Sequence, residues 1–293
     1  MKRSSFIKYL LGTTAMASAY STLKNLSDLL PENDHMMPAL FVGHGSPMNA
    51  LEDNEFTQEW KKYAGKIPQP SVILCVSAHW LTKGTHVTAM QNPQTIHDFG
   101  GFPKQLYDVQ YPAPGSPSFA KETAYALHPT PVGQDLQWGL DHGTWSVVKQ
   151  MYPKANIPVI QLSIDYHQSG TYHYELARNL QKLRKKGVLI LGSGNMVHNL
   201  GMVAFDRLNE KEYGYDWALE MNIKFKELIE KGDHLALAQY EKLGPAAKLA
   251  IPTPDHYYPL LYSLALQQRG EQVTFFNDKA IGGSLTMTSV FIA

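Results

Sequence analysis

Three histidines stand close behind runs of apolar residues of strand length. His44 follows "ALFVG", His79 follows "VILCVSA", and His198 comes after "LILGSGNMV". In open α/β sheets the carboxyl ends of neighbouring strands meet at one edge, and ligands bind beyond them. Neutral imidazole is the commonest protein ligand of zinc and also suits iron. The pattern therefore predicts that these histidines converge on one divalent metal.

A fourth histidine and several glycines belong to the same pattern. His256 lies in "PTPDHYYPLL", a turn that enters an apolar helical segment. Glycines flank His44 on both sides and occur twice in "LGSGN", shortly before His198. Glycine lets a backbone turn sharply or approach a ligand closely. We expect Gly43 and Gly45 to clear space around His44 for a metal and a substrate.

The runs before these histidines are nearly continuous in apolar residues, which is typical of parallel strands covered on both faces. Segments of helical character alternate with them or follow them. The pattern predicts an α/β fold: a single domain over 37–293 with a mostly parallel central sheet, helices on both faces and the metal site at the carboxyl ends of the strands. The final apolar segments resemble a hairpin that adds antiparallel edge strands. The expected strands are "PALFVGH", "SVILCVSAH", "IPVIQLSID", "GVLILGSGN", 272–278 and 284–293, and the expected helices span 53–64, 116–127, 144–152, 171–186, 214–231, 233–243 and 257–268.

The composition narrows the classes of partner. Lys and Arg number 26 and Asp and Glu number 26, so the formal net charge is zero. No long-range field then favours nucleic acid or an anionic membrane. The only dense basic run, "KLRKKG" at 182–187, is interpreted as a solvated helix end rather than a phosphate site. The single cysteine, Cys75, lies inside an apolar run and is expected to be a buried small hydrophobe.

A long stretch with little regular pattern, 91–117, follows the second apolar run. Loops of this length in compact domains are usually functional. Its aromatic residues Phe99, Phe102, Tyr107 and Tyr111 either line a pocket for a flat ligand or fill a satellite core.

Two histidines in glycine-rich turns, His97 and His142, are each next to an aspartate. Asp98 and Asp141 are expected to cap helices or to hold imidazole tautomers. The remaining histidines have no companion motif, and we expect them to be solvent-exposed without a role; they are His35, His86, His128, His167, His173 and His234.

Seven strings in consistent order resemble the DOPA-type class of extradiol aromatic ring-cleaving dioxygenases. The similarity runs from about Met37 to the C-terminus. It implies a small aromatic diol, a DOPA-like catechol, as the substrate and O2 as the second substrate. It also implies one divalent metal per chain, Zn²⁺ or non-haem Fe²⁺, and leaves the oligomeric state open. The strings are "PALFVGHGSPMNALEDN", "VSAHW", "IHDFGGFP", "YPAPGSP", "DHGTW", "GSGNMVHNL" and "TPDHYYPLLY".

The resemblance implies a ligand set. His44, His79 and His256 bind the metal, while His198 is either an additional ligand or the acid–base residue. Ring-cleaving relatives often use a carboxylate as third ligand, giving the two-His-one-carboxylate face of non-haem iron. Here the matching position is His256. Three neutral ligands favour an anionic catecholate and leave zinc and iron both open.

The resemblance also implies a substrate side. His198 and His142 are the expected catalytic residues, because an imidazole titrates near neutral pH and can transfer protons. His142 lines the substrate side of the metal. We expect His97, Phe99 and Tyr257 to contact the substrate together with His142.

Two other classes use the same histidines. A zinc-dependent hydrolase would lower the pKa of a bound water and would need a carboxylate base, for which Asp98, Asp141 or Asp255 is available. A non-catalytic metal carrier would need neither an open coordination position nor an aromatic pocket. A serine nucleophile is disfavoured, because "LGSGN" is not a G-x-S-x-G elbow.

Residues 1–36 are interpreted as an export signal followed by a linker. "MKRSSFIKYLLGTTAMASAY" has a basic start, a short apolar stretch and small residues at 17–19 that fit a cleavage site. The stretch is too short and too polar to span a membrane. Its match to a twin-arginine signal is imperfect, because an extra serine follows Lys2-Arg3. Periplasmic export is the expectation, and the N-terminal tail of a cytoplasmic protein is the alternative.

Removal of residues 1 to about 19 can be tested directly in the native cell. Mass spectrometry of the protein from the periplasmic fraction should show a chain that begins close to residue 20, because signal peptidase cleaves after small residues. An intact N-terminus in the cytoplasmic fraction would rule out export.

Overall fold

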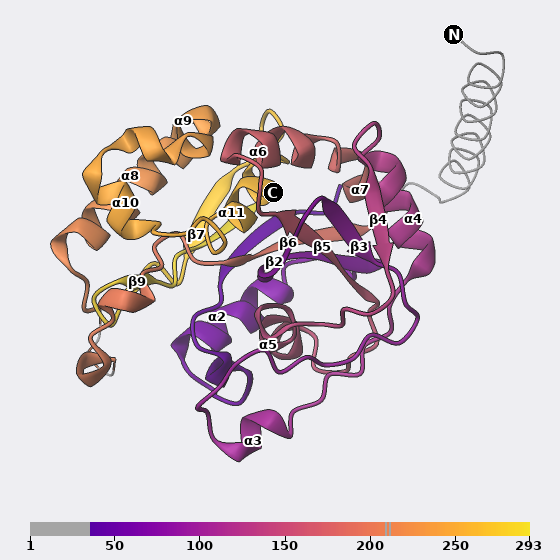
Figure 1. Ribbon diagram of the computed structural model, residues 1–293, viewed down its shortest axis with the longest axis horizontal. Helices are drawn as coiled ribbons and strands as arrows, with labels where there is room; N and C mark the ends of the chain where they lie inside the picture. The colour runs from indigo at the N-terminus through magenta and orange to yellow at the C-terminus, as the bar shows by residue number, and fades with distance from the viewer. Residues whose placement is uncertain (1–35, 209, 211) are drawn as a thin grey trace, which may run out of the picture.

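The computed structural model describes residues 36–208, 210 and 212–293, and they form an α/β fold (Figure 1). An eight-stranded sheet is made of β1 (Ala39–Gly43), β2 (Val72–Thr82), β3 (Thr85–Thr88), β4 (Val132–Asp135), β5 (Val159–Asp165), β6 (Val188–Gly194), β7 (Val273–Phe276) and β10 (Ser289–Ile292). The strand order is β4-β3-β5-β2-β6-β1-β10-β7. A separate two-stranded sheet pairs β8 (Ala280–Ile281) with β9 (Leu285–Thr286).

The centre of the sheet is parallel, as the sequence predicts. β5, β2, β6 and β1 are joined by parallel pairs, whereas β1, β10 and β7 pair antiparallel. The expected antiparallel C-terminal strands are therefore confirmed. The sequence analysis missed β3 and β4, which pair in parallel with each other. Each is four residues long, and "VGQD" of β4 has too few apolar residues to form a pattern.

The helices are α2 (Glu55–Ala64), α3 (Lys104–Tyr107), α4 (Pro117–Ala126), α5 (His142–Met151), α6 (Gly170–Arg178), α7 (Gln181–Lys185), α8 (Asp216–Glu230), α9 (His234–Ala238), α10 (Pro245–Ala250) and α11 (Tyr258–Leu264). Side-chain caps begin several of them: Asn54 caps α2 in a capping box, and Ser116 precedes Pro117 in α4. The prediction of a single helix over 171–186 is wrong, because this segment forms two helices, α6 and α7. The segment 233–243 likewise divides into α9 and a 3-10 turn.

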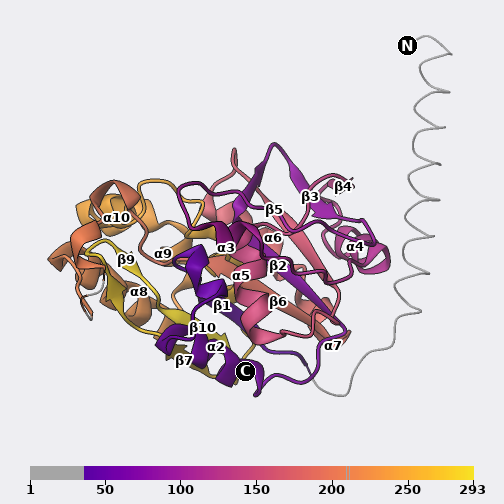
Figure 2. The same cartoon turned by 90° about the horizontal axis from the view of Figure 1, so that it is seen from below.

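Helices cover both faces of the sheet (Figures 1 and 2). In β1, Ala39 and Phe41 belong to one apolar cluster, which includes residues of α6, α7, α8 and α11. Leu40 and Val42 belong to the other cluster, which includes residues of α2 and α5. Successive side chains of a strand point to opposite faces, so a strand buried on both sides must be apolar throughout. This explains the continuous runs of the sequence. Both views place α8, α9 and α10 together at one side of the sheet.

The interpretation of 182–187 as a solvated helix end is wrong for two of its cations. Arg184 is fully buried; its Nε donates to the carbonyl oxygen of Met37, and its guanidinium pairs with Glu271. Lys186 is 8% exposed and pairs with Glu122. These partners are distant in sequence, so the local charge run carried no sign of them. Cys75 is buried, as expected.

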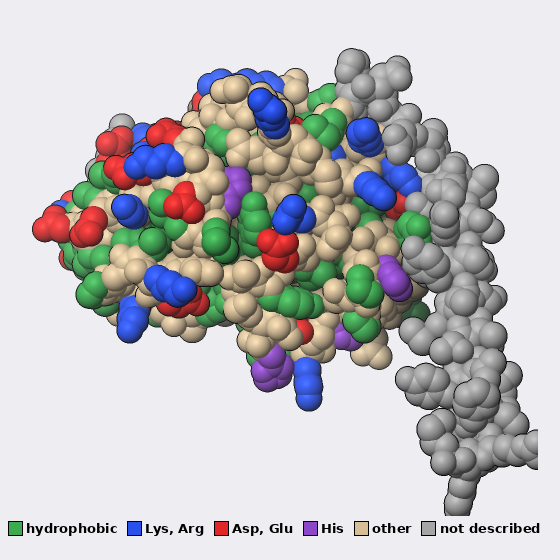
Figure 3. All heavy atoms as spheres, turned by 90° about the horizontal axis from the view of Figure 1, so that it is seen from above, with side chains coloured by type: hydrophobic (Ala, Val, Ile, Leu, Met, Phe, Trp, Pro, Cys, Tyr) green, Lys and Arg blue, Asp and Glu red, His purple; other side chains and the backbone are tan. Residues whose placement is uncertain are grey.

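The expected export signal and linker lie outside the described residues, except for Met36. Within the described part of the chain, no helix has the length and apolar character needed to cross a membrane. On the face drawn in Figure 3, basic and acidic side chains lie among one another rather than gathering by sign.

Glycines near the strand ends make room for the chain itself. A Cβ at Gly43 would lie 2.6 Å from the carbonyl oxygen of Met287, and one at Gly45 would lie 2.5 Å from the sulfur of the same residue. Gly45 also has a φ of +60°, which favours glycine. Our expectation that these glycines clear space for a ligand is therefore wrong, because the nearest atoms belong to the segment between β9 and β10.

The same holds for β6, where the chain leading into α11 crosses the strand end. A Cβ at Gly194 would lie 2.1 Å from the carbonyl oxygen of His256, and one at Gly192 would lie 2.3 Å from that of Pro259. The His256 carbonyl also accepts a hydrogen bond from the backbone nitrogen of Asn195 at 2.8 Å. Direct backbone contact with β6 thus fixes the position of His256.

Substitution Gly194→Ala should therefore destabilise the protein and displace His256. Overpacking of this kind costs about 1–3 kcal/mol, measured as a lower denaturant midpoint, and metal content should fall with it. Gly65→Ala is the matched control: its Cβ would meet its nearest atom at 3.4 Å, so its stability should change by less than about 0.5 kcal/mol. Equal midpoints for Gly194→Ala and the wild type would contradict this account of His256.

Candidate metal centre

His44, His79 and His256 come together at the carboxyl edge of the sheet. One ring nitrogen from each lies within 4.8 Å of those of the other two. The three ring centroids are separated by 5.1, 5.2 and 5.0 Å. His44 and His256 are buried, and His79 is 19% exposed. The structure thus brings together the three histidines that the sequence analysis assigned to the metal.

His44 lies just beyond the end of its strand, whereas His79 lies within its strand. His44 directly follows β1, and its backbone nitrogen donates to the carbonyl oxygen of Gly194 at 3.0 Å. His79 was expected beyond the end of its strand, but β2 continues to Thr82. The register between β2 and β5 shifts between Val76 and Leu81, so His79 lies in an irregular stretch of the strand. Such bulges re-aim side chains without ending the strand.

A serine sets the tautomer of His44. The Ser193 hydroxyl donates to the carbonyl oxygen of Gly143 at 2.5 Å, and its oxygen lies 3.1 Å from Nδ1 of His44. A hydroxyl has one proton, so Ser193 must accept from His44. Nδ1 of His44 therefore carries the proton, and its Nε2 presents a free lone pair.

Carboxylates stand behind the other two rings. Nδ1 of His256 hydrogen-bonds to Asp255 Oδ2, and Nδ1 of His79 lies 3.6 Å from Asp98 Oδ2. The hydrogen bond to Asp255 holds the proton on Nδ1 of His256 and leaves the Nε2 lone pair free. Asp98 is too far from His79 for a hydrogen bond, but its charge favours a proton on Nδ1 of that ring as well. Each of the three imidazoles can thus offer Nε2 to a common point.

The spacing of the free nitrogens fits ligands of one ion. Nε2 of His44 lies 3.2 Å from Nε2 of His79. At metal–nitrogen bonds of about 2.0–2.1 Å, neighbouring ligands of one ion lie roughly 3.0–3.4 Å apart. Without a metal, one of these two nitrogens can donate a hydrogen bond to the other, and an ion bound between them would take the place of that proton. A donor set of three imidazoles suits zinc and iron alike.

The pKa values of His44 and His79 favour the neutral, metal-binding form of these rings. Burial, followed by the neighbouring histidines, holds the pKa of His44 and of His79 well below the ordinary value. Both rings are therefore neutral at pH 7, which is the form that binds metals. Burial raises the pKa of Asp98 and of Asp255, but their histidine hydrogen bonds outweigh it and lower both pKa values overall. Both carboxyl groups are ionised at neutral pH.

His198 stacks on His256. The two ring centroids are 3.5 Å apart and the rings are inclined by 6°. The backbone nitrogen of His198 donates to the carbonyl oxygen of Ala250 at 2.9 Å, and a bridge to Leu285 holds its other side. Burial, followed by His256, lowers the pKa of His198 to about 3.

His142 begins α5 on the other side of His79. Their ring centroids are 3.9 Å apart, and Asp98 Oδ1 accepts from both the backbone nitrogen and Nδ1 of His142, at 2.9 and 3.0 Å. Phe99 meets the His142 ring edge-on at 5.5 Å. His142 and Phe99 thus extend the site beyond the three metal-directed rings.

Comparison with known proteins identifies the family. The description "Catalytic LigB subunit of aromatic ring-opening dioxygenase" matches residues 36–278. The chain belongs to this family. It is 45% identical over 263 residues to a 4,5-DOPA dioxygenase extradiol of Escherichia coli K12, covering 87% of this chain and 94% of that protein. It is 35% identical over 266 residues to one of Beta vulgaris, covering 87% and 96%.

A solved structure is also similar. The crystal structure of an uncharacterized protein from Escherichia coli K12 has a TM-score of 0.74 and 41% identity, covering 88% of this chain and all of that one. The resemblance noted in the sequence is confirmed, and the protein is an extradiol ring-cleaving dioxygenase of the DOPA dioxygenase type. The family implies a divalent metal, for which the three imidazoles provide a fitting donor set.

The carboxylates that a hydrolase would need are engaged elsewhere. Asp141 is fully buried and caps α5 through Thr144, while also accepting from Ser77 and Gln161. Asp98 and Asp255 face the Nδ1 atoms of histidines, on the opposite side of those rings from Nε2. The geometry of this dioxygenase therefore gives the hydrolase alternative no base beside the metal-directed nitrogens among these three candidates.

Two residues that were expected to contact the substrate, His97 and Tyr257, make their hydrogen bonds away from the histidine cluster. His97 donates from Nε2 to the carbonyl oxygen of Val109 at 2.9 Å and lies in an aromatic cluster with Phe99. Tyr257 is 1% exposed, and its hydroxyl donates to the carbonyl oxygen of Leu237. Its ring packs against Phe225 in the helical core. The structure does not bring Tyr257 to the histidine cluster.

Of the aromatic residues in the loop 91–117, one is a core residue and the others cluster beside the site. Tyr111 is buried, and its hydroxyl donates to the carbonyl oxygen of Tyr152, so it belongs to the core. Phe99, Phe102 and Tyr107 form a cluster next to His142, and Phe99 is its member in contact with that ring.

Two histidines expected to be exposed are buried. His173 is fully buried between the hydroxyl of Tyr262 and the carbonyl oxygen of Asp165, and His234 is 8% exposed beside Tyr174. His173 lies in α6, whose polar and apolar residues are mixed, and His234 begins the five-residue α9, which is too short to show a face in the sequence. His128 and His167 are exposed, His86 is partly buried, and His35 lies outside the described residues.

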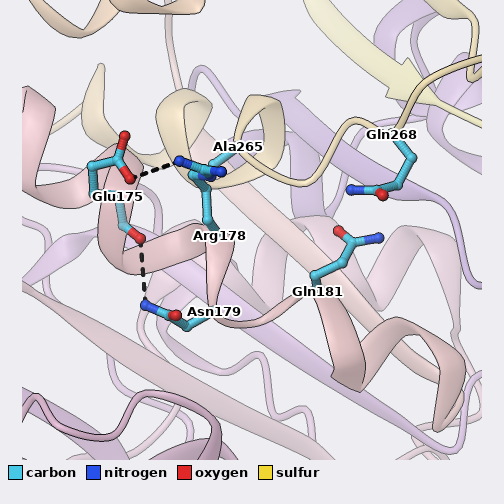
Figure 4. Close-up of a pocket in the computed structure, with 6 residues that line it drawn as sticks. All are labelled: Glu175, Arg178, Asn179, Gln181, Ala265 and Gln268. Carbon is cyan, nitrogen blue, oxygen red and sulfur yellow. Dashed lines mark hydrogen bonds and ion pairs between the residues drawn. The ribbon is translucent and has the colours of Figure 1, made fainter.

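The pocket drawn in Figure 4 is separate from the metal centre. It is lined from α6, α7 and the end of α11, by Glu175, Arg178, Asn179, Gln181, Ala265 and Gln268. None of the site histidines contributes to it.

Sequence reasoning missed Ser193, which sets the tautomer of His44. Its position in "LGSGN" was noted only to exclude a nucleophile. Because the bond joins residues 149 positions apart, no local pattern could have shown it. A hydroxyl residue at the end of a strand next to the His44 strand was the one available signal.

Removal of a metal-directed histidine should remove the metal. We expect His44→Ala, His79→Ala and His256→Ala each to reduce the content from one ion per chain to a small fraction, measured by elemental analysis, because two imidazoles cannot hold the ion as tightly. His167→Ala, at an exposed position, is the control and should keep the full content. Unchanged metal in all three site variants would disprove this ligand set.

Proposed function

We propose that this dioxygenase opens the ring of a DOPA-like catechol beside the diol, with Fe²⁺ held by His44, His79 and His256. The observation that carries the proposal is the convergence of three imidazoles, each with its Nδ1 turned outward to a hydroxyl or carboxylate oxygen. The relatives whose names specify DOPA cover nearly the same length of chain. The DOPA-like substrate follows from that similarity.

Iron, rather than zinc, is the metal of the proposal. Zinc has no redox chemistry, whereas bound iron would supply electrons for O2 and positive charge for the catecholate oxygens. The imidazole set itself accepts either ion. A test must therefore load each metal separately.

We assign His198 to acid–base chemistry rather than to the ligand set. An imidazole binds a metal in its own ring plane, at about 2.0–2.1 Å. The rings of His198 and His256 are stacked, with centroids 3.5 Å apart and planes inclined by 6°, so the two residues would not direct their nitrogens at the same ion in this arrangement. His198 is neutral at pH 7 and can accept a proton from a catechol hydroxyl. An anionic substrate nearby would raise its pKa, because opposite charge favours the imidazolium.

His142 and Phe99 form the proposed substrate side. Asp98 holds the proton on Nδ1 of His142, which leaves Nε2 as an acceptor for a substrate hydroxyl. Phe99, in contact with the His142 ring, offers an apolar surface to a flat ring. His97 contacts Phe99 rather than His142, and Tyr257 has no part in the proposed substrate side.

The proposal predicts oxygen consumption with a catechol. Protein reconstituted anaerobically with Fe²⁺ should consume one O2 per DOPA and form a yellow ring-opened semialdehyde, followed by an oxygen electrode and by absorbance. Zinc-loaded protein should not, and phenol should not replace the catechol. His198→Gln should lower kcat by about 10²–10⁴-fold while changing catechol binding much less.

The controls separate the alternatives. If His198→Gln instead loses its metal, His198 is a ligand and the acid–base role belongs elsewhere. If iron-loaded protein consumes no oxygen across a broad catechol panel yet hydrolyses esters or amides, the catechol proposal fails.

A further inference from the structure

Asp98 lies between two imidazoles of the site rather than behind one. Its Oδ1 accepts from the backbone nitrogen and from Nδ1 of His142, at 2.9 and 3.0 Å. Its Oδ2 lies 3.6 Å from Nδ1 of His79. That distance is too long for a hydrogen bond, but it is short enough for the carboxylate charge to attract the Nδ1–H dipole of the neutral ring. The Asp98 side chain is 19% exposed, so solvent screens this attraction only in part.

The backbone around Asp98 is tied to the start of α5. The nitrogen of Ile96 donates to the carbonyl oxygen of Leu140, and the nitrogen of Leu140 donates to that of Gln94, each at 2.7 Å. The indole nitrogen of Trp145 donates to the carbonyl oxygen of Ile96 at 2.8 Å. These bonds fix the loop beside His142, so the position of the carboxylate is set before any ligand arrives.

We propose that Asp98 is a positioning residue that serves both imidazoles at once. It holds His142 in the Nδ1–H tautomer with Nε2 available to the substrate, and it steadies His79 in the orientation that presents Nε2 to the metal. The substrate half of this statement rests on the proposed function, whereas the tautomer and the metal half do not. One carboxylate thereby links the substrate side to the metal side of the site.

Two substitutions separate the two contacts. Asp98→Ala removes the acceptor from both imidazoles. Asp98→Asn keeps one carbonyl oxygen, which can accept both bonds from His142, and turns an NH2 group toward the Nδ1–H of His79. The alanine variant should therefore disturb both histidines, while the asparagine variant should spare His142 and disturb His79.

The variants should differ in two measurable constants. Loss of a carboxylate behind a metal ligand typically costs about 10–100-fold in metal affinity, so both variants should bind Zn²⁺ roughly 10-fold or more weakly in competition with a chromophoric chelator. At saturating Fe²⁺, Asp98→Ala should raise the KM for the catechol about 10-fold, whereas Asp98→Asn should stay close to the wild type. A stability defect alone would not produce this division between the constants.

Matched variants and a spectroscopic signal make the test specific. Asp255→Asn should weaken metal binding without raising KM at saturating metal, because Asp255 hydrogen-bonds to His256 and not to His142. Asp108→Asn, at an exposed aspartate of the same loop, should change neither constant. Nitrogen-15 NMR of zinc-loaded protein should show the Nδ1–H tautomer of His142 in the wild type and in Asp98→Asn, and its loss in Asp98→Ala.

A double-mutant cycle decides whether Asp98 acts through His142. In a His142→Ala background, Asp98→Ala should no longer raise KM but should still weaken Zn²⁺ binding. The proposal is overturned if Asp98→Ala leaves both the Zn²⁺ affinity and the His142 tautomer as in the wild type, or if its effect on KM persists without His142. If iron-loaded wild-type protein oxidises no catechol, the proposed function fails, and the tautomer and Zn²⁺ affinity still decide the role of Asp98.

Discussion

The metal centre depends on what lies behind each imidazole. A histidine can present either ring nitrogen, and only a fixed partner at Nδ1 makes Nε2 the free one. Ser193 supplies that partner for His44, Asp98 for His79 and Asp255 for His256. Without these partners, the rings could turn or change tautomer, and three nitrogens would not meet at one point.

Close backbone contacts beside His44 and His256 explain why glycines occur next to these histidines. His256 reaches the site because the chain before α11 lies directly on Gly194, with a carbonyl where a Cβ would be. Met287 likewise lies against Gly43, next to His44. Close approach of backbones leaves little freedom for the side chains that they carry. Backbone packing therefore sets where His44 and His256 lie, and the hydrogen bonds at their Nδ1 atoms set how the two rings are oriented.

The charge balance of the site follows from the same arrangement. If His44, His79 and His256 hold the ion, as proposed, no carboxylate ligand would compensate its positive charge directly. Asp98 and Asp255, both ionised, lie beyond the rings and offset part of that charge across an imidazole. A bound metal would then still attract an anionic oxygen donor, and the two carboxylates would stay out of its coordination positions. A carboxylate bound directly would lower that attraction.

The sequence by itself determined the α/β fold, the parallel centre of the sheet and the four histidines at its edge, because buried strands need continuous apolar runs and ligand residues follow them. Only the tertiary structure decided the tautomers, since Ser193 and His44 are 149 residues apart. It also decided that His79 lies in an irregular stretch of β2, that His198 stacks on His256, and that Tyr257 and Arg184 are core residues. Local patterns record which face of an element is apolar; they do not record which distant atom lies opposite a given polar group.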